Sequence, residues 1–209
     1  MEPRRISEAV IRRLPRYYRH LTMLEEQGIE RISSGALAEQ MGLNASQIRQ
    51  DFNCFGGFGQ QGYGYHVKSL LGEITNILSL DQKHSVIIAG AGNIGRALAN
   101  FDGFERVGFQ VRALFDSSEV KIGAEFSGKP VFDITRMPAY IKENGITIGV
   151  IAARRSAAQH IADMMVGAGI RGIWNFAPVD VAAPVPVENV HLNDSIYVLS
   201  YRLGKFTAE

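Results

Sequence analysis

The residues with the clearest chemical signature lie between Gly90 and Asp116. Three glycines, Gly90, Gly92 and Gly95, form a G-x-G-x-x-G pattern directly after the apolar run Val86-Ile87-Ile88-Ala89. In a strand-to-helix turn the first glycine permits the tight bend, and the second lets the backbone approach a pyrophosphate. The third glycine lets helix and strand pack closely. The pattern therefore predicts a dinucleotide-binding turn, although a glycine-rich turn without a ligand is the alternative.

A second signal follows the glycines at the expected distance. Asp116 ends the alternating stretch 109–115, about 20 residues after the last glycine, where an acid hydrogen-bonds the adenosine ribose. An acid there favours NAD over NADP, because a 2′-phosphate would face like charge. The loop residues expected to contact the cofactor are Gly90, Ala91, Gly92, Asn93, Ile94 and Gly95.

The chain beyond this acid alternates strand-like and helix-like stretches. Apolar runs at 129–132, 146–152 and 172–175 are typical of buried strands, and helical segments at 136–144 and 156–166 lie between them. This order predicts a Rossmann-like doubly wound parallel sheet in an α/β chain. Ligands bind beyond the carboxyl ends of such strands, which places beside the glycine loop Ala152, Ala153, Asn175, Phe176 and Pro178.

The chain ends in a separate helical segment. Residues 194–203 follow a proline-rich stretch at 178–187 and carry Ile196, Leu199 and Leu203 at helical spacing. A terminal amphipathic helix set off in this way is typical of a dimerisation element.

The first part of the chain predicts a helix-turn-helix. A helix capped by Ser33 runs to Met41, Gly42 makes the turn, and Asn44 caps a second helix over 45–52. An ordinary helical hairpin is the alternative. The second helix is expected to present outward the side-chain types that read base edges or bind phosphates, namely Ser46, Gln47, Arg49 and Gln50.

A glycine- and aromatic-rich stretch follows at 55–65. Its glycines permit a tight hairpin, which after a helix-turn-helix would be the wing of a winged helix that touches phosphates or the minor groove. A flexible linker is the alternative, but linkers are rarely so aromatic. The wing residues expected near DNA are Gln60, Gln61 and Tyr63.

The first 20 residues contain six arginines and two glutamates. Such a cluster, which includes Arg12 and Arg16, is a candidate phosphate-contacting face, and a solvated helix face is the alternative. Together these features predict a winged-helix DNA-binding domain at 1–80, a Rossmann domain at 84–190 and a C-terminal helix at 191–209.

Composition narrows the function classes. The 209 residues carry a net charge of +1 and one cysteine, Cys54, which excludes an internal disulfide and favours the cytoplasm. No apolar run is long enough to span a bilayer, so a membrane is not an expected partner. No acid/base pair and no metal-ligand set stands out beside the cofactor site, so no catalytic residue and no metal site is predicted.

The combination resembles one family, the Rex redox-sensing transcriptional repressors. The resemblance covers nearly the whole chain. It rests most specifically on the motifs ISSGALAEQMG (32–42), QIRQDFNCFGGFGQQGYGY (47–65), AGAGNIG (89–95), ALFDSSEVKIG (113–123) and IWNFAP (173–178).

The resemblance implies a homodimer that binds palindromic double-stranded operator DNA and exchanges its C-terminal helix between subunits. It also implies that the Rossmann domains bind NADH or NAD⁺ and that NADH releases the DNA, controlling genes of fermentation or respiration. The glycine loop would then hold the pyrophosphate, Asp116 the ribose, and Asn175, Phe176 and Pro178 the nicotinamide end. Lys121, in the motif ALFDSSEVKIG (113–123), joins the expected cofactor set, and Arg49 and the wing would meet DNA.

The chain also departs from that family. Other members often carry lysine or arginine in the wing where Gln60 and Gln61 stand here, which should weaken salt-dependent DNA affinity. Some members join a tyrosine and an aspartate to an arginine of the first helix in a state-dependent network. Here Arg16 is retained, but Phe101 and His191 occupy the other two positions, so that switch is not expected.

Two other functions fit the same motifs. One is an NAD-dependent oxidoreductase with an added domain, although little chain remains for a substrate domain. The other is a regulator that responds to a different nucleotide, such as coenzyme A.

Overall fold

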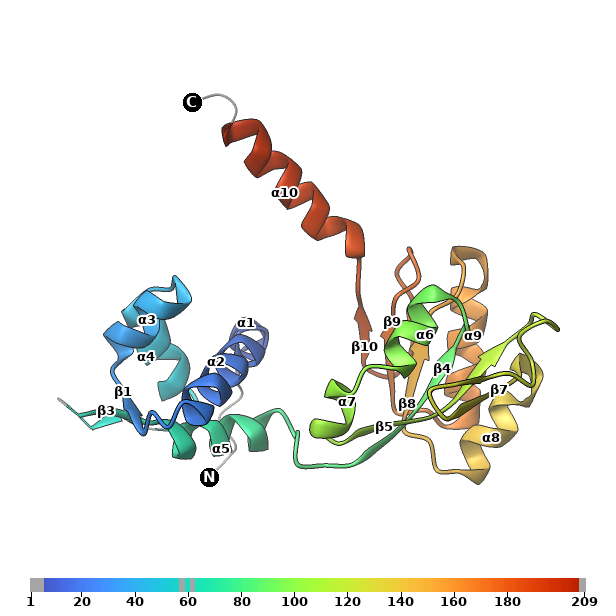
Figure 1. The fold of residues 1–209 in the computed structure, drawn as a ribbon, viewed down its shortest axis with the longest axis horizontal. Helices are drawn as coiled ribbons and strands as arrows, with labels where there is room; N and C mark the ends of the chain where they lie inside the picture. The colour runs from blue at the N-terminus through green and yellow to red at the C-terminus, as the bar shows by residue number, and fades with distance from the viewer. Residues whose placement is uncertain (1–5, 57–58, 61–62, 207–209) are drawn as a thin grey trace. The chain divides into compact units, whose positions relative to one another are not determined.

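The computed structural model describes residues 6–56, 59–60 and 63–206. The chain divides between Asp81 and Gln82 into two compact units (Figure 1). Each unit has its own apolar core and is described by itself.

Helices around one core build the first unit. They are α1 (Glu8–Ile11), α2 (Leu14–Glu26), α3 (Ser34–Met41), α4 (Ala45–Asn53) and α5 (Val67–Ile77). Pro15 lies in the first turn of α2 and so separates α2 from α1, because proline can begin a helix but cannot continue one. Leu14, Tyr17 and Leu21 of α2 are fully buried, and they belong to the same core as Ile48 and Phe52 of α4.

A small antiparallel sheet completes the first unit. Its strands, in the order β1-β3-β2, are β1 (Arg31–Ile32), β3 (Gly64–His66) and β2 (Gly59–Gln60). Gly64 has φ +71°, and a Cβ there would overlap the Ile32 backbone of the neighbouring strand, so only glycine fits. Helices α3 and α4 followed by this hairpin confirm the predicted winged helix.

The second unit is organised by a larger sheet. Its strands are β4 (His84–Ala89), β5 (Phe109–Asp116), β6 (Glu125–Phe126), β7 (Lys129–Asp133), β8 (Ile148–Ile151), β9 (Gly172–Asn175) and β10 (Val187–Asn189). The spatial order is β10-β9-β8-β4-β5-β7-β6, with every pair parallel except β6 with β7. Leaving out β6, this is the Rossmann order 3-2-1-4-5-6, with the topological switch point between β4 and β8.

Both faces of this sheet are buried. Along β4, Ile87 and Ala89 belong to one core cluster, whereas Val86 and Ile88 belong to the other. Successive side chains of a strand point to opposite faces, so each cluster covers one face of the sheet. The helices of this unit are α6 (Asn93–Ala99), α7 (Gly103–Arg106), α8 (Met137–Glu143), α9 (Arg155–Ala168) and α10 (Leu192–Phe206), with a 3-10 turn at Ile134–Arg136.

Three elements of the second unit were not anticipated, besides the 3-10 turn. The short helix α7 lies between α6 and β5, the strand β6 pairs antiparallel with β7, and the strand β10 follows the proline-rich stretch and pairs with β9. The last helix, Leu192–Phe206, lies within the predicted 191–209 and extends beyond the stretch 194–203 that carries its apolar spacing. None of the residues described in α10 is buried.

Candidate functional site

The turn after β4 shows why two of its three motif glycines are glycines. Gly90 has φ +110°, and a Cβ on it would overlap the Ala152 carbonyl at the end of β8. A Cβ on Gly95 would overlap the carbonyl of Gly90 itself. These two glycines are therefore required by the protein's own packing at the switch point, where β4 and β8 are neighbours.

Gly92 is different. Its φ of −83° is accessible to any residue, and a Cβ added to it would meet no atom within 4 Å. Nothing in the protein therefore demands glycine at this position. A backbone kept bare beside open space fits the close approach of a ligand such as a pyrophosphate.

Asp116 ends the strand next to this turn. Its Oδ2 accepts hydrogen bonds from the Ala91 N–H at 2.8 Å and from Lys121 Nζ at 3.0 Å, and its Oδ1 accepts from the Ser118 N–H at 2.9 Å. Burial raises the pKa of Asp116, but the hydrogen bonds from Lys121, Ser118 and Ala91 outweigh it, so the pKa lies below its ordinary value. Three bonds leave this charged carboxylate with acceptor capacity for a ribose hydroxyl.

The rest of the predicted loop lies at the same edge. Ala91 is buried, whereas Asn93 and Ile94 are exposed in the first turn of α6. Asn93 Oδ1 accepts a hydrogen bond from Arg96 at 3.0 Å. Ala152 donates its N–H to the Ala89 carbonyl at 2.8 Å, which brings the end of β8 against the start of the glycine loop. The half-buried Ala153 follows Ala152 directly.

The segment after β9 is held by its own side chains. Asn175 is completely buried, and its amide nitrogen donates to the carbonyl of Val179 at 2.7 Å and to Asn189 Oδ1 at 2.8 Å. Both N–H groups of Asn175 are therefore used by the protein. Phe176 is half-buried with its ring 4.6 Å from that of Trp174, and Pro178 is exposed. The predicted contact of these residues with the nicotinamide stays a prediction.

In the first unit, the predicted recognition helix has two faces. Ser33 and Asn44 cap α3 and α4 as expected, and Gly42 makes the turn with φ +62°. Of the four side chains expected to point outward from α4, three are exposed: Ser46, Arg49 and Gln50. The fourth, Gln47, is half-buried, and its amide nitrogen donates to Asp51 Oδ1 at 2.8 Å.

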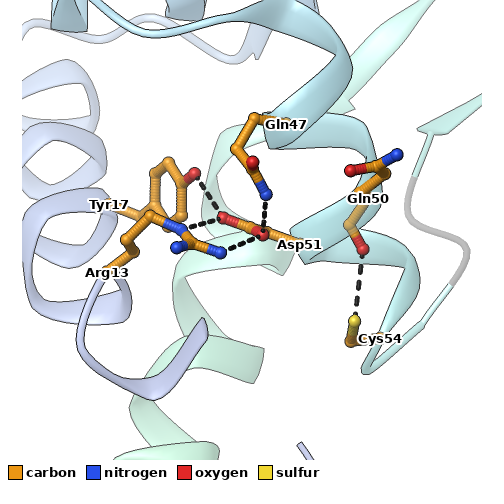
Figure 2. Close-up of polar contacts among 6 residues, drawn as sticks. All are labelled: Arg13, Tyr17, Gln47, Gln50, Asp51 and Cys54. Atoms are coloured by element: carbon orange, nitrogen blue, oxygen red, sulfur yellow. Dashed lines mark hydrogen bonds and ion pairs between the residues drawn. The ribbon is translucent and has the colours of Figure 1, made fainter. Parts of the chain in front are cut away.

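Asp51 is the centre of a buried network that the sequence motifs did not indicate (Figure 2). Its side chain is only 1% exposed. Both of its oxygens accept from the Arg13 guanidinium at 2.7 Å, and Oδ2 also accepts from the Tyr17 hydroxyl at 2.8 Å. The bonds from Arg13 and Tyr17 join α2 to α4, and the Gln47 amide adds a bond within α4.

The network keeps Asp51 charged. Burial raises the pKa of Asp51, but the hydrogen bonds from Arg13, Tyr17 and Gln47 lower it by more. The pKa of Asp51 therefore lies below its usual value. Burial and the nearby Asp51 raise the pKa of Tyr17, which therefore remains a donor. One sequence signal could have revealed this site: Asp51 shares a helix face with the buried Ile48 and Phe52, where an acid is unexpected.

The remaining candidate DNA contacts belong to the first helices and the wing. Arg12 is exposed and pairs with Glu8 at 3.1 Å, and Arg16 donates to the Met41 carbonyl at 3.3 Å. Tyr63 is 71% exposed in the wing. Gln60 lies in β2, with only its backbone described, and Gln61 lies outside the described residues.

The two departures from the family pattern have ordinary protein contacts. Phe101 is 58% exposed, and its ring packs against Phe104 at 4.9 Å. The His191 Nε2 atom lies 2.7 Å from Asp180 Oδ1. Across residues 6–56, 59–60 and 63–206, no group of histidine, cysteine, aspartate or glutamate side chains could hold a metal ion. No described helix is both long and apolar enough to cross a membrane.

Two family models match parts of the chain. Residues 5–53 match a family model described as "Putative DNA-binding protein N-terminus". Residues 81–179 match a second model, described as "CoA binding domain".

Two Rex repressors are similar to this chain over nearly its whole length. A redox-sensing transcriptional repressor Rex from Clostridium botulinum (strain Hall) is 50% identical over 202 residues, covering 96% of each chain. The Rex repressor of Clostridium perfringens (strain SM101) is 49% identical over 201 residues, covering 95% of each chain.

Solved structures agree with these sequences. The crystal structure of RSP, a Rex-family repressor, in complex with β-NAD⁺ and operator DNA superimposes with a TM-score of 0.91 at 48% identity. That match covers 98% of this chain and 95% of the other. The RSP complex with β-NADH has a TM-score of 0.90 at 45% identity, covering 97% and 96% of the two chains. With such identity along nearly its whole length, the chain belongs to the Rex family of redox-sensing transcriptional repressors.

Proposed function

We propose that this chain is a repressor that binds palindromic operator DNA as a homodimer through its winged helix and leaves the DNA when its Rossmann unit binds NADH. The observation that carries the proposal is the full-length match to RSP, which has been solved with NAD⁺ and operator DNA and with NADH. The proposed domains are 1–80 for DNA, 84–190 for the cofactor and 191–209 for dimerisation. The target genes would be those of fermentation or respiration, in the cytoplasm.

The cofactor edge supports this proposal through its open glycine and its charged acid. The bare backbone at Gly92 would receive the pyrophosphate, and Asp116 would accept from the adenosine ribose while Lys121 helps to hold its carboxylate in place. When bound, the nicotinamide ring supplies the redox signal, because it is cationic in NAD⁺ and neutral in NADH. The half-buried aromatic pair Trp174 and Phe176 favours a neutral ring, since burying an unpaired cation is costly.

The DNA face is supported by the exposed side chains of α4. Arg49 and Gln50 can reach base edges or phosphates, with Ser46 beside them at the helix start. Arg12, Arg16, Tyr63 and the wing glutamines are proposed as further contacts. Gln47 is better assigned to holding Asp51 than to reading bases, because its amide nitrogen already donates to that carboxylate.

A second copy of the chain would cover α10. Its large apolar side chains are between 51% and 80% exposed, at Leu192, Ile196, Tyr197, Val198, Leu199, Tyr201, Leu203 and Phe206. Isolated chains rarely expose so much contiguous apolar surface, and homodimers bury such surfaces symmetrically.

Linkage explains how the cofactor would act on DNA. A ligand that prefers the arrangement unable to bind DNA shifts the population toward it by its differential affinity. The test is fluorescence anisotropy of a labelled palindromic operator, titrated separately with NADH, NAD⁺, NADPH and coenzyme A at fixed salt. Release by NADH at concentrations where the others have little effect is expected. Release by coenzyme A alone would mean that the ligand is coenzyme A and not NADH. Operator binding that none of the four ligands changes would refute the sensing role.

Gly92→Ala sharpens this test. The added methyl group meets no protein atom but fills the space that the pyrophosphate would need, so the variant should fold, bind operator and lose its NADH response. The matched control is Gly72→Ala, another glycine where a Cβ would meet open space, but one that lies in α5 of the first unit. An unchanged NADH affinity in Gly92→Ala, measured by the fluorescence of bound NADH, would contradict the proposed site.

A further inference from the structure

The loop after β9 is tied to the start of α10 by a pair of asparagines. Asn175 is the last residue of β9, and Asn189, its neighbour in register, is the last residue of β10. The Asn175 amide nitrogen donates to Asn189 Oδ1 at 2.8 Å, and the Val190 N–H donates to the Asn175 carbonyl at 2.8 Å. The ends of the two strands are thus joined through both side chains and backbone.

The same two side chains also hold both ends of the loop at 176–181. Asn175 Oδ1 accepts from the Ala177 N–H at 3.0 Å, and Asn189 Oδ1 accepts from the Val181 N–H at 3.1 Å. The loop therefore cannot shift at either end without changing a hydrogen bond of Asn175 or Asn189. Phe176 donates its N–H to the Ile151 carbonyl at 2.8 Å, which connects the loop to the end of β8 at the proposed cofactor edge.

On its other side this joint leads directly into α10. The helix begins at Leu192, two residues after Val190, and none of its described residues is buried in the second unit. Its attachment at 189–191 is therefore what sets its direction in this unit. The contact between His191 and Asp180 adds a weaker tie, because Asp180 is exposed and surface ion pairs contribute little.

A neutral amide pair suits such a joint. Buried amides are costly unless they are hydrogen-bonded, and hydrogen bonds fix direction in a way that apolar packing does not. Among the described residues, no buried side-chain nitrogen or oxygen lacks a partner, and both the amide nitrogen and the oxygen of the buried Asn175 are hydrogen-bonded in this arrangement. A different loop conformation would require Asn175 and Asn189 to find new partners.

We propose that Asn175 and Asn189 are positioning residues that couple the loop at 176–181 to the start of α10, so that binding of NADH beside the loop repositions the dimerisation helix. This inference rests on the proposed function, because it assigns a route between the cofactor edge and the surface that a second subunit would cover. Neither side chain needs to touch the cofactor for this role.

The test compares two substitutions of Asn189 in the full-length protein. Asn189→Leu keeps the approximate volume and removes the acceptor, whereas Asn189→Asp keeps an oxygen that can accept from both Asn175 and Val181. For Asn189→Leu we expect NADH affinity and operator affinity without NADH within about threefold of the parent. The factor by which NADH weakens operator binding, which in allosteric proteins is typically about 5- to 150-fold, should fall close to one. Asn189→Asp should retain most of the factor by which NADH weakens operator binding.

Gln159→Leu is the matched control. Gln159 also anchors the segment after β9, through hydrogen bonds with the backbone of Ala182, but it ties that segment to α9 and not to β10. Its NADH response should match that of the parent. Equal losses in Gln159→Leu and Asn189→Leu would show that any loosening of the segment has this effect, and would overturn the assignment.

Hydrogen exchange of the unmodified protein gives a readout that does not depend on a variant folding. Addition of NADH should change the protection of the Val181 and Val190 amides, which bond to Asn189 and Asn175. Unchanged protection with NADH bound would overturn the inference. If the parent protein binds NADH but keeps its DNA, the proposed function fails, and the exchange experiment still decides the role of the joint.

Discussion

Each of the two units contains a polar network centred on a buried side chain, Asp51 in the first and Asn175 in the second, and the two networks differ in charge. In the first unit, Asp51 is ionised and is held by the Arg13 guanidinium and two neutral donors. In the second unit, Asn175 and Asn189 share only neutral hydrogen bonds. The charged network joins two helices, whereas the neutral one joins a strand end, a loop and the start of α10.

This difference indicates what each region can do. A buried carboxylate that loses its cation is strongly penalised, so Arg13 and Asp51 must stay together and fix α4 against α2. A neutral amide can change partners at a smaller cost, since a typical hydrogen bond contributes about 1 kcal/mol net. A fixed recognition helix and a movable connection to α10 are the expected results.

The largest effect is expected from breaking the charged network. Arg13→Met would leave Asp51 buried without its cation, which should lower the free energy of unfolding of the first unit by about 3–5 kcal/mol. Urea unfolding at fixed protein concentration, followed by circular dichroism, measures this change. A loss of less than about 1 kcal/mol would mean that water replaces the guanidinium and that the network is not rigid.

Breaking the neutral network should cost less. Asn189→Leu leaves one N–H of the Asn175 amide and the Val181 N–H without their acceptor. Because Asn189 is only half-buried, water can replace part of the lost bonding, so we expect a loss of about 1–3 kcal/mol in total. The same unfolding measurement should therefore show a smaller loss than Arg13→Met. If Asn189→Leu lowers the free energy of unfolding more than Arg13→Met does, the second network serves to stabilise the fold and not to couple the loop to α10.

Acid should separate the networks further. The folded-state pKa of Asp51 lies below its unfolded value, so its contribution to stability is complete above about pH 4 and is lost as the pH falls through the folded pKa. Asp51→Asn should therefore be less stable than the parent at pH 7, with the difference shrinking on acidification. The stability difference between Asn189→Leu and the parent should stay constant over that range, because no charge changes there.

The smallest effects should distinguish positioning from contact within α4. Gln47→Leu removes one donor to Asp51 and should lower stability by about 1 kcal/mol, weakening binding to all DNA sequences alike. Gln50→Ala, at an exposed position, should leave stability unchanged and alter the preference for particular bases. Competition binding with operator variants measures both effects. A changed base preference in Gln47→Leu would show that Gln47 contacts bases after all.

The parts of this molecule that the sequence predicted depend on short segments. The glycine turn and Asp116 could be placed because their geometry is imposed by a strand, a turn and a helix that are adjacent in the chain. The helix-turn-helix was recognisable from its caps and Gly42 for the same reason.

The features that were missed depend on partners distant in sequence. Asp51 meets Arg13 across 38 positions, and neither residue belongs to a motif that requires the other. The strand β10 has only three residues, begins where the proline-rich stretch ends, and exists because β9 offers it a parallel partner. Asn175 was predicted as a cofactor contact from its position after a strand, but its buried side chain depends on Asn189, which only the folded sheet brings near.

The exposed apolar side chains of α10 also affect how long a pair of subunits would stay together. If a second copy covers these leucines and tyrosines, separating the subunits would return all of that apolar surface to water, at about 25 cal/mol for each Å². Release from DNA would then occur within an intact pair of subunits. A pair assembled once would pass through many rounds of repression and derepression, and newly synthesised subunits would mix with old ones only slowly.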